Sequence, residues 1–594
     1  MGGTVSEGGE TPREPSLAQD RVGPRWGLLV CVAIVVAYGW GIFERDLWIP
    51  DEIRVGEIAR EMYVNHAYTI PTLAGQPFLE KPPLYHWATC LSFATLGVTD
   101  GAVRLPAALF GLIGLLFSFR IARRLGGPRV GWIAVAVLSS SYAFVYHSHQ
   151  ALVDPALAAG VAMCLDAFLA IEALPRGERA RGRIVWAGVT LAVGFYAKGV
   201  IGLVLPLAIL GVWALLQRRL DLIWKAMPAA LAIAIALLVP WFISLSRVGG
   251  SEALELVLWD NTLQRLLPFL GGDYSGGHSR PFWYYFEQLP GVLVPWSLLP
   301  IAAVLEHWRG RRSGGTVSRA RSLGAVWFLV GFGLLSAAGT KRALYLLPLL
   351  GGSALYLAGW LEPILVGRRA PDRLETWLLR ATVLALPIVI VAYGVHSWTQ
   401  FGTIPAAGVL ASLAILGAGL ALATFGRSVA WGRVAACTFG LCLAIWATSG
   451  TALLPAQNGV ESARPFAEAI ERIVPKDAPL ISFAPTEAML AIVPFYTGRL
   501  PEVVFDIGEM QSRLNGPGPV WFVGIERLRD ERAPYLLDWL APARAWIVEK
   551  RWVNAGTYRL LLLRGGANQE PALRTAPEDE TDSASHGPSD GPSR

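Results

Sequence analysis

A charged segment between two apolar stretches carries the residues with the clearest chemical potential. Residues 47–86 read LWIPDEIRVGEIAREMYVNHAYTIPTLAGQPFLEKPPLYH and combine acidic, basic and histidine side chains. Asp51 and Arg54 lie one helical turn apart, and Glu80 precedes Lys81 directly. Ionisable groups near a membrane are costly unless they are paired or functional. The segment therefore fits either a solvated loop, which composition alone favours, or a polar site at a membrane surface.

The first half of this segment predicts a short helix. The tripeptide Pro-Asp-Glu at 50–52 has the form of a helix start, with Asp51 as a candidate N-cap. Ile53, Ile58 and Met62 then fall on one helical face. We expect an amphipathic helix that lies at the membrane surface.

The rest of the chain has the composition of a polytopic membrane protein. Its 594 residues have a mean hydropathy of +0.44, and only 16% of them are charged. Apolar runs of membrane-spanning length recur along the sequence. Five cysteines without CxxC spacing indicate neither a disulfide framework nor a thiolate metal site. We expect thirteen spans, near 26–43, 101–119, 130–147, 151–173, 184–197, 199–217, 226–246, 288–306, 323–338, 343–361, 376–397, 404–424 and 430–452.

The arginines predict the orientation of these spans. Basic clusters follow every even-numbered span, for example at 120–129, 176–183 and 309–321. By the positive-inside rule, those loops and the N-terminus are cytoplasmic. The other loops and the C-terminus then face outward, which is the periplasm of a Gram-negative inner membrane.

The same patterns divide the chain into four regions. Residues 1–25 are expected to be a disordered cytoplasmic N-terminus, and residues 565–594 a disordered tail. Residues 26–453 form the transmembrane domain, with outer loops at 44–100 and 247–287. Residues 454–564 predict a small α/β periplasmic domain. Its expected elements are a helix at 462–474 and strands at 479–483, 520–525, 544–548 and 557–563.

The groups on the predicted outer face suit the transfer of a group from a lipid-linked phosphate. Cations at a membrane surface suit a phosphate at the end of a lipid chain. Carboxylates beside it suit deprotonation of a hydroxyl, or stabilisation of positive charge on a sugar. The carboxylates are Asp51, Glu52, Glu80 and Asp154. The cations include Arg54, Lys81, Lys198, Arg265, Lys341 and Arg342, of which we favour Lys341 over Arg342 as a ligand.

Several motifs also resemble a known family, in that family's order, from about Leu47 to Leu350. They are LWIPDEIRVGEIAREM, PFLEKPPLYHW, ALVDP, FYAKGV, DNTLQRLL with HSRPFWYYFEQLPGVLVPW, and SAAGTKRALYLLPLL. Together they resemble the bacterial polyprenyl-phosphate-sugar glycosyltransferases of the GT-C class. That class contains the aminoarabinose transferases that modify lipid A and relatives of the protein O-mannosyltransferases. One departure is Val55, where relatives usually carry an aromatic residue.

The resemblance implies a GT-C fold, an outer-face site and a polyprenyl-phosphate-sugar donor. It makes Asp51 the first catalytic carboxylate and Asp154 the second acidic residue of the site. Arg54, Lys81, Lys198 and Tyr345 would hold the donor phosphate, and the outer-face cations Arg265 and Lys341 join this group. Tyr345 fits an aromatic belt at the membrane interface equally well.

The sequence thus predicts an enzyme that moves a sugar, with inversion, to a lipid A, glycan or protein acceptor. No nucleic-acid partner is expected. The sequence indicates no definite cofactor, and Glu80 and His278 are a candidate pair of ligands for a divalent metal ion. The alternative is a transporter of lipid-linked or anionic polysaccharide substrates, which predicts charges near the bilayer midplane. Charges on one face only favour the enzyme.

Overall fold

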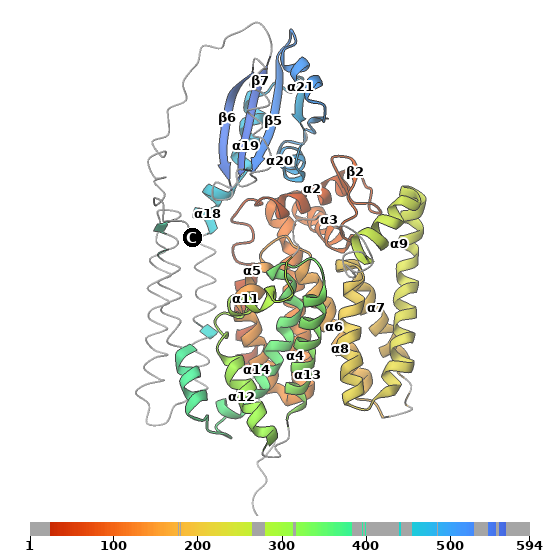
Figure 1. Cartoon of the computed structure of the whole chain (residues 1–594), viewed down its shortest axis with the longest axis vertical. Coiled ribbons are helices and arrows are strands. Elements are labelled where there is room, and N and C mark those ends of the chain that lie inside the picture. Colours follow the sequence, from red (N-terminus) through yellow and green to blue (C-terminus); the bar gives the residue numbers. More distant parts are fainter. Residues whose placement is uncertain are drawn as a thin grey trace, which may run out of the picture.

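A bundle of apolar helices with a polar layer and a mixed sheet beyond one end makes up the structure (Figure 1). The computed structural model describes residues 24–175, 178, 180–263, 280–312, 317–382, 395, 398–399, 439–440, 454–483, 485–527, 545–553 and 558–565. The expected spans near 376–397, 404–424 and 430–452 lie largely outside these residues, as do the two predicted disordered termini.

The bundle helices follow most of the expected spans. They are α1 (Pro24–Gly39), α4 (Asp100–Ser140), α6 (Asp154–Glu172), α7 (Arg181–Lys198), α8 (Ile201–Leu216), α9 (Met227–Glu255), α12 (Leu299–Arg312), α13 (Arg319–Ala337) and α14 (Leu350–Leu365). Short π-helical segments flank α9 at η2 (Leu222–Ala226) and η3 (Leu256–Leu263). Among the described residues, five stretches are long and apolar enough to cross a membrane: 100–140, 154–172, 222–259, 319–337 and 343–365.

Glycines explain where two pairs of neighbouring spans divide. The long helix α4 is interrupted at Gly127, whose φ of 86° separates the two spans expected there. Its second half ends at Ser140 instead of continuing to residue 147, and a separate short helix α5 (Tyr142–Ser148) follows. The predicted division between the fifth and sixth spans is confirmed, because Gly199 with a φ of 72° separates α7 from α8.

One expected span is wrong as drawn. The run at 288–306 was predicted to be one helix, but it contains the end of α11 (Tyr284–Val292) and the start of α12. Pro295 and Pro300 lie in and just after the break, where each removes a backbone donor from the helical pattern. The next outer loop leads into a 3-10 helix, η5 (Ala343–Leu349), which contains Pro348 and continues into α14.

A polar layer covers one end of the bundle. It consists of α2 (Asp51–Val64), the hairpin β1 (Thr72–Leu73) and β2 (Gln76–Pro77), and α3 (Leu84–Leu96). The apolar face of α2 is buried as predicted. Glu52, Glu57 and Glu61 are buried too, so the expected polar surface of this helix is wrong. The reason is tertiary. C-terminal elements pack against the apolar face of α2, and the β1–β2 hairpin encloses Glu61, which accepts hydrogen bonds from the Thr72 hydroxyl and the backbone N–H of Ala74.

The C-terminal residues form a five-stranded mixed sheet in the order β4-β3-β5-β7-β6. Strand β3 is parallel to β4 and β5, whereas β7 is antiparallel to β5 and β6. The helices here are α18 (Leu454–Glu461), α19 (Arg464–Ile473), α20 (Glu487–Thr497) and α21 (Ile507–Leu514). The strands are β3 (Leu480–Phe483), β4 (Glu502–Val504), β5 (Val520–Arg527), β6 (Ala545–Val553) and β7 (Tyr558–Gly565).

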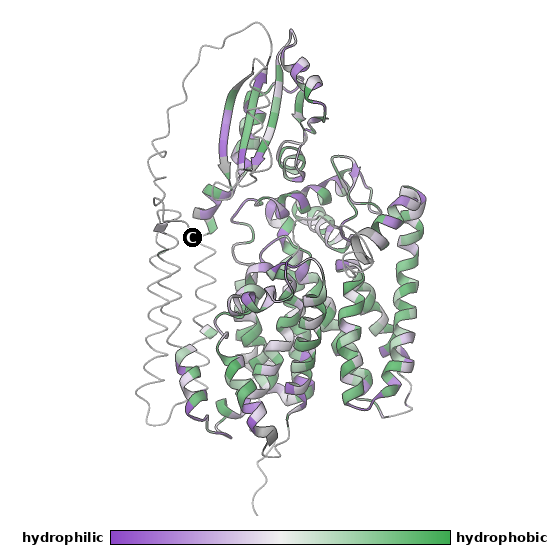
Figure 2. Ribbon diagram, in the orientation of Figure 1, coloured by the Kyte–Doolittle hydropathy of each residue, from purple (hydrophilic) through white to green (hydrophobic). Residues whose placement is uncertain are grey.

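The helix and four strands predicted in this region correspond to α19, β3, β5, β6 and β7. The sequence reading missed α18, α20, β4 and α21. Strand β4 has three residues, too few for a periodicity, and α20 is mostly apolar and buried, which hides its amphipathic signal. Figure 2 separates the two environments: the bundle is mainly hydrophobic, and polar residues gather in the layer above it and in the sheet.

Candidate active site

Asp51 is the centre of a group of charges at the polar end of the bundle. It is the first residue of α2, and the N-cap position belongs to Pro50, which makes no side-chain capping bond. The predicted N-cap role of Asp51 is therefore wrong. Its Oδ1 accepts a hydrogen bond of 2.9 Å from Arg54, and its Oδ2 accepts one of 2.9 Å from Arg342. Two guanidinium groups, from α2 and from the segment before η5, thus converge on one carboxylate.

These cations determine the charge of Asp51. Burial raises the pKa of the Asp51 carboxyl, but Arg342, Arg54 and Lys81 together outweigh it and lower the pKa below its usual value. Asp51 is therefore ionised at neutral pH. Conversely, burial lowers the pKa of Arg342, and the neighbouring Asp51 more than restores it. The pair is a charged pair, with the Arg342 side chain 34% exposed.

Asp154, Lys198 and Tyr345 form a second group beside the first. Asp154 begins α6, again without a side-chain capping bond, and forms an ion pair with Lys198 at the end of α7. The Lys198 Nζ lies 3.9 Å from the centroid of the Tyr345 ring. Arg342 lies close enough for Asp51, Asp154 and Tyr345 all to act on its charge. Arg342 therefore connects the two groups.

Close helix packing explains why Asp154 meets Lys198. A Cβ at Gly160 of α6 would lie 3.1 Å from the Cα of Gly194 in α7, and a Cβ at Gly194 would lie 2.5 Å from the carbonyl oxygen of Gly202 in α8. Glycines of this kind let helix backbones approach closely inside a membrane. The polar ends of α6 and α7 are thereby held together.

The backbone conformation determines which of Lys341 and Arg342 faces Asp51. Arg342 has an extended conformation, with φ −135° and ψ 146°, and neighbouring side chains on an extended segment point to opposite sides. Arg342 faces Asp51, whereas the Nζ of Lys341 is buried and donates to the carbonyl oxygens of Ala338 and Arg280. A ligand role for Lys341 stays a prediction, and the cation directed at Asp51 is the one that the sequence reading ranked second.

The other predicted residues lie at the edge of this site or outside the described part of the chain. Lys81 is 3.4 Å from Glu80 and near enough to Asp51 to lower its pKa. Arg265 and His278 fall among the residues that the structure does not describe. The described residues contain no group of three or more His, Cys, Asp or Glu side chains that could hold a metal ion. The pairing of Glu80 with His278 on a metal stays a prediction.

Glu52, the neighbour of Asp51, has a different role. Its carboxylate accepts hydrogen bonds from Arg45 and Arg104 and from the backbone N–H groups of Trp48 and Ala151. Burial raises the pKa of Glu52, but the two guanidinium groups outweigh it and hold the pKa far below its usual value. Glu52 therefore fixes the loop and helix ends that surround the site.

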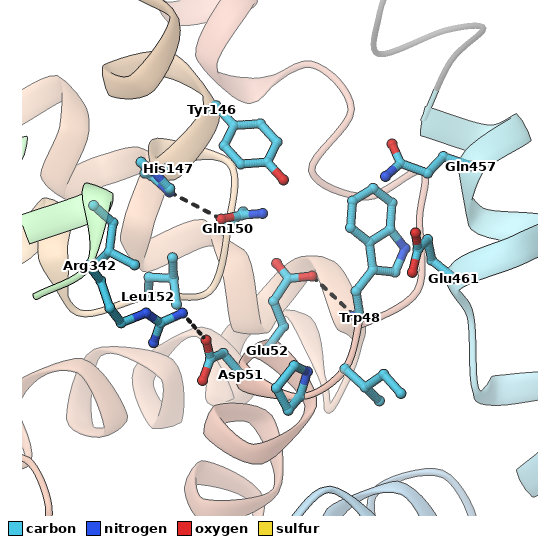
Figure 3. A pocket seen from close by; sticks show the side chains of 13 residues that line it. Trp48, Asp51, Glu52, Tyr146, His147, Gln150, Leu152, Arg342, Gln457 and Glu461 are labelled. Carbon is cyan, nitrogen blue, oxygen red and sulfur yellow. Dashed lines mark hydrogen bonds and ion pairs between the residues drawn. The ribbon is translucent and has the colours of Figure 1, made fainter. Parts of the chain in front are cut away.

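A cavity of about 310 Å³ opens beside Asp51 (Figure 3). Asp51 and Arg342 line one part of it, and Gln457 and Glu461 of α18 face it from another element. The lining residues are Trp48, Ile49, Pro50, Asp51, Glu52, Tyr146, His147, Gln150, Leu152, Arg342, Leu344, Gln457 and Glu461. The α18 residues could not be identified from the sequence, since a short polar helix after a span has no distinctive pattern.

Comparison with known proteins agrees with this architecture. Residues 80–244 match the sequence profile of the family described as dolichyl-phosphate-mannose-protein mannosyltransferase. The undecaprenyl phosphate-α-4-amino-4-deoxy-L-arabinose arabinosyl transferase of Edwardsiella ictaluri is 28% identical over 562 residues, covering 92% of this chain and 95% of that protein. A transferase of the same description from Pseudomonas fluorescens is 30% identical over 345 residues, covering 56% of this chain and 59% of that protein.

The same relationship appears among solved structures. The crystal structure of ArnT from Cupriavidus metallidurans bound to undecaprenyl phosphate superimposes with a TM-score of 0.70 at 20% identity, covering 92% of this chain and all of that one. The apo form of the same protein superimposes equally well. The resemblance seen in the sequence motifs is confirmed: the chain is a multi-pass α-helical membrane protein with the GT-C fold, related to the aminoarabinose and protein O-mannosyl transferases.

Proposed function

We propose that this protein is a glycosyltransferase that moves a sugar from a polyprenyl-phosphate donor to an acceptor at the polar end of the bundle. The observation that carries the proposal is the ionised Asp51 held between Arg54 and Arg342 at the edge of a cavity, beside Lys198 and Asp154. Its relatives over nearly the full length are undecaprenyl-phosphate-dependent transferases. The transporter alternative lacks support, because Asp51 begins α2, in the polar layer at one end of the bundle (Figure 1).

The cations would hold the donor phosphate. Arg54, Arg342 and Lys81 act on Asp51, and Lys198 lies beside Tyr345, so a phosphate entering here meets positive charge from several elements. As the acceptor oxygen bonds to the anomeric carbon, the bond from that carbon to the phosphate oxygen breaks. The phosphate leaves with the electron pair, and nearby cations stabilise the added charge. Attack from the opposite face inverts the anomeric centre.

The charge of Asp51 favours an acceptor that is already ionised. A general base works best when its pKa lies near the operating pH, and the pKa of Asp51 is lowered instead. A hydroxyl acceptor must lose a proton, whereas a phosphate acceptor needs no base. We therefore propose a lipid A phosphate as the acceptor, with Asp51 orienting the cations and stabilising positive charge on the sugar. Glycan or protein hydroxyls are the alternatives.

The proposal includes an arrangement in the bacterial inner membrane. We place the N-terminus in the cytoplasm, thirteen spans in residues 26–453, and residues 454–564 in the periplasm. A cysteine at Ser512, which is exposed in α21, should react with an impermeant thiol reagent in spheroplasts of a cysteine-free background. A cysteine at Arg373, in a predicted cytoplasmic loop, should react only after lysis. The reverse pattern would overturn the orientation.

Transfer itself can be measured with purified protein in lipid nanodiscs. Undecaprenyl phosphate-linked 4-amino-4-deoxyarabinose and lipid A are mixed, and lipid A is analysed by mass spectrometry. We expect a pentosamine to be added to lipid A and undecaprenyl phosphate to be released. Transfer only to a glycan or protein supplied in parallel would show that this molecule, and not lipid A, is the acceptor. A folded protein that uses no lipid-linked donor with any acceptor would contradict the function.

A further inference from the structure

The C-terminal part of the chain supplies one wall of the cavity. Helix α18 carries Gln457 and Glu461, which face the cavity next to the indole of Trp48 (Figure 3). This wall is fixed to the first outer loop, because the Oδ1 of Asn458 accepts hydrogen bonds from the backbone N–H of Asp46, at 2.9 Å, and from the Nε1 of Trp48, at 3.3 Å. Residues more than 400 positions apart therefore build one side of the site.

Glu461 differs from the other two carboxylates of the cavity in its partners. Asp51 and Glu52 each contact two guanidinium groups, whereas Glu461 has no ion pair with any residue that the structure describes. Its neighbours are Gln457, whose side chain hydrogen-bonds to it, and Tyr146, on whose hydroxyl its charge acts. A half-buried carboxylate without a cation is unfavourable unless a ligand supplies the missing charge.

The chemistry of this wall suits an ammonium group. A carboxylate and an amide oxygen accept hydrogen bonds from an ammonium, and the face of an indole attracts a cation. The guanidinium of Arg45 already lies over one face of the Trp48 ring, at 4.0 Å, so the ring can offer a ligand only its other face or its edge. A phosphate would be repelled by Glu461, so the two parts of the cavity favour opposite charges.

We propose that Glu461, with Gln457 and Trp48, binds the amino group of an amino sugar carried by the lipid-linked donor. The proposal rests on the proposed function and assigns the C-terminal segment to sugar selection. The donor would place its phosphate among Arg54, Arg342 and Lys81, and its sugar would extend across the cavity toward α18. The cavity volume of about 310 Å³ falls within the range of small-ligand sites, about 300–1,000 Å³.

The test compares two donors that differ in one group. Undecaprenyl phosphate-linked 4-amino-4-deoxyarabinose carries the ammonium, and undecaprenyl phosphate-linked arabinose carries a hydroxyl in its place. The wild-type protein should prefer the amino donor in kcat/KM. Glu461→Gln should reduce this preference about 10- to 100-fold, chiefly through KM, because a hydrogen bond to a charged group is lost. Glu461→Asp keeps the charge and should restore part of the preference.

Controls separate this role from a structural one. Glu471→Gln, a matched change at an exposed position of α19, should leave the preference unchanged. Equal losses with both donors in Glu461→Gln would show a structural role and overturn the inference, as would an unchanged preference. A preference that follows an amine on the acceptor instead of the donor would also overturn it. A wild-type protein that uses neither donor would contradict the proposed function itself, and this inference with it.

Discussion

Asp51 and Glu52 are neighbours in the sequence, yet they belong to two different ionic groups. Glu52 is enclosed, with a side chain 5% exposed, and its partners Arg45 and Arg104 are 2% and 0% exposed. Asp51 is 22% exposed, and its partners Arg54 and Arg342 are 19% and 34% exposed. Arg342 borders the cavity and can turn toward a ligand, whereas Arg45 and Arg104 are buried with Glu52 and cannot. We therefore infer that Glu52 stabilises the structure around the site, and the role of Asp51 in the reaction stays a prediction.

The largest expected effect is a loss of turnover when Asp51, and not Glu52, loses its charge. Asp51→Asn keeps the size of the side chain and removes its charge. Turnover should fall by roughly 100- to 1,000-fold, the range for loss of one group that stabilises transition-state charge, while undecaprenyl phosphate still binds. Turnover assays and binding measurements in nanodiscs check this. Near-normal turnover with every acceptor would remove Asp51 from the mechanism.

Glu52→Gln should act on stability instead. Removing one charge from a buried ionic group leaves Arg45 and Arg104 without compensation, at a cost of about 3–5 kcal/mol. We expect a lower unfolding temperature and poor yield in detergent, and Asp51→Asn should change the unfolding temperature much less. A Glu52→Gln protein as stable as the wild type would show that the buried group is not needed for the fold.

The adjacent cations extend the comparison to donor binding. Arg342→Ala and Lys198→Ala should each weaken the binding of undecaprenyl phosphate about 10- to 100-fold, since each would remove a charge-assisted contact. Lys341→Ala is the matched control, because its Nζ is directed at backbone carbonyls. A larger effect for Lys341→Ala than for Arg342→Ala would restore the order that the sequence suggested.

The smallest expected effect concerns pH. The lowered pKa of Asp51 means that its charge persists as pH falls from 8 to 5 and is lost only below the ordinary range of an aspartate, about 4. Burial raises the pKa of Glu461 despite its hydrogen bond to Gln457, so that carboxylate is neutralised at a higher pH. As pH falls, the preference for an amino donor should therefore decline before Asp51-dependent turnover does.

The pH profile needs one further control. His147 lines the same cavity, and burial lowers its pKa, so its own titration is expected below its usual range near 6.5. The profile should keep its shape in His147→Asn if Glu461 controls the preference. A loss of turnover that parallels the loss of preference in the wild type would show that one group controls both.

The sequence by itself determined the class of the molecule and many of its chemical groups. Apolar runs require only local composition, so most bundle helices were predicted, including the division at Gly199. Asp51, Arg54, Asp154, Lys198 and Tyr345 were selected because charged and phenolic groups at span ends are unusual, and they do come together. Their roles stay predictions. The N-cap role of Asp51 was wrong, because Pro50 occupies that position and the Asp51 carboxylate accepts hydrogen bonds from Arg54 and from the distant Arg342.

Only the tertiary structure decided which cation faces Asp51 and what closes the cavity. Lys341 and Arg342 are equivalent in sequence, but an extended backbone sends them to opposite sides. The apolar face of α2 packs against C-terminal elements, and the β1–β2 hairpin encloses Glu61. Glu461 lines the cavity although it lies more than 400 residues beyond Asp51. Periodicity reports the faces of one element, and it contains no information about which distant element will cover them.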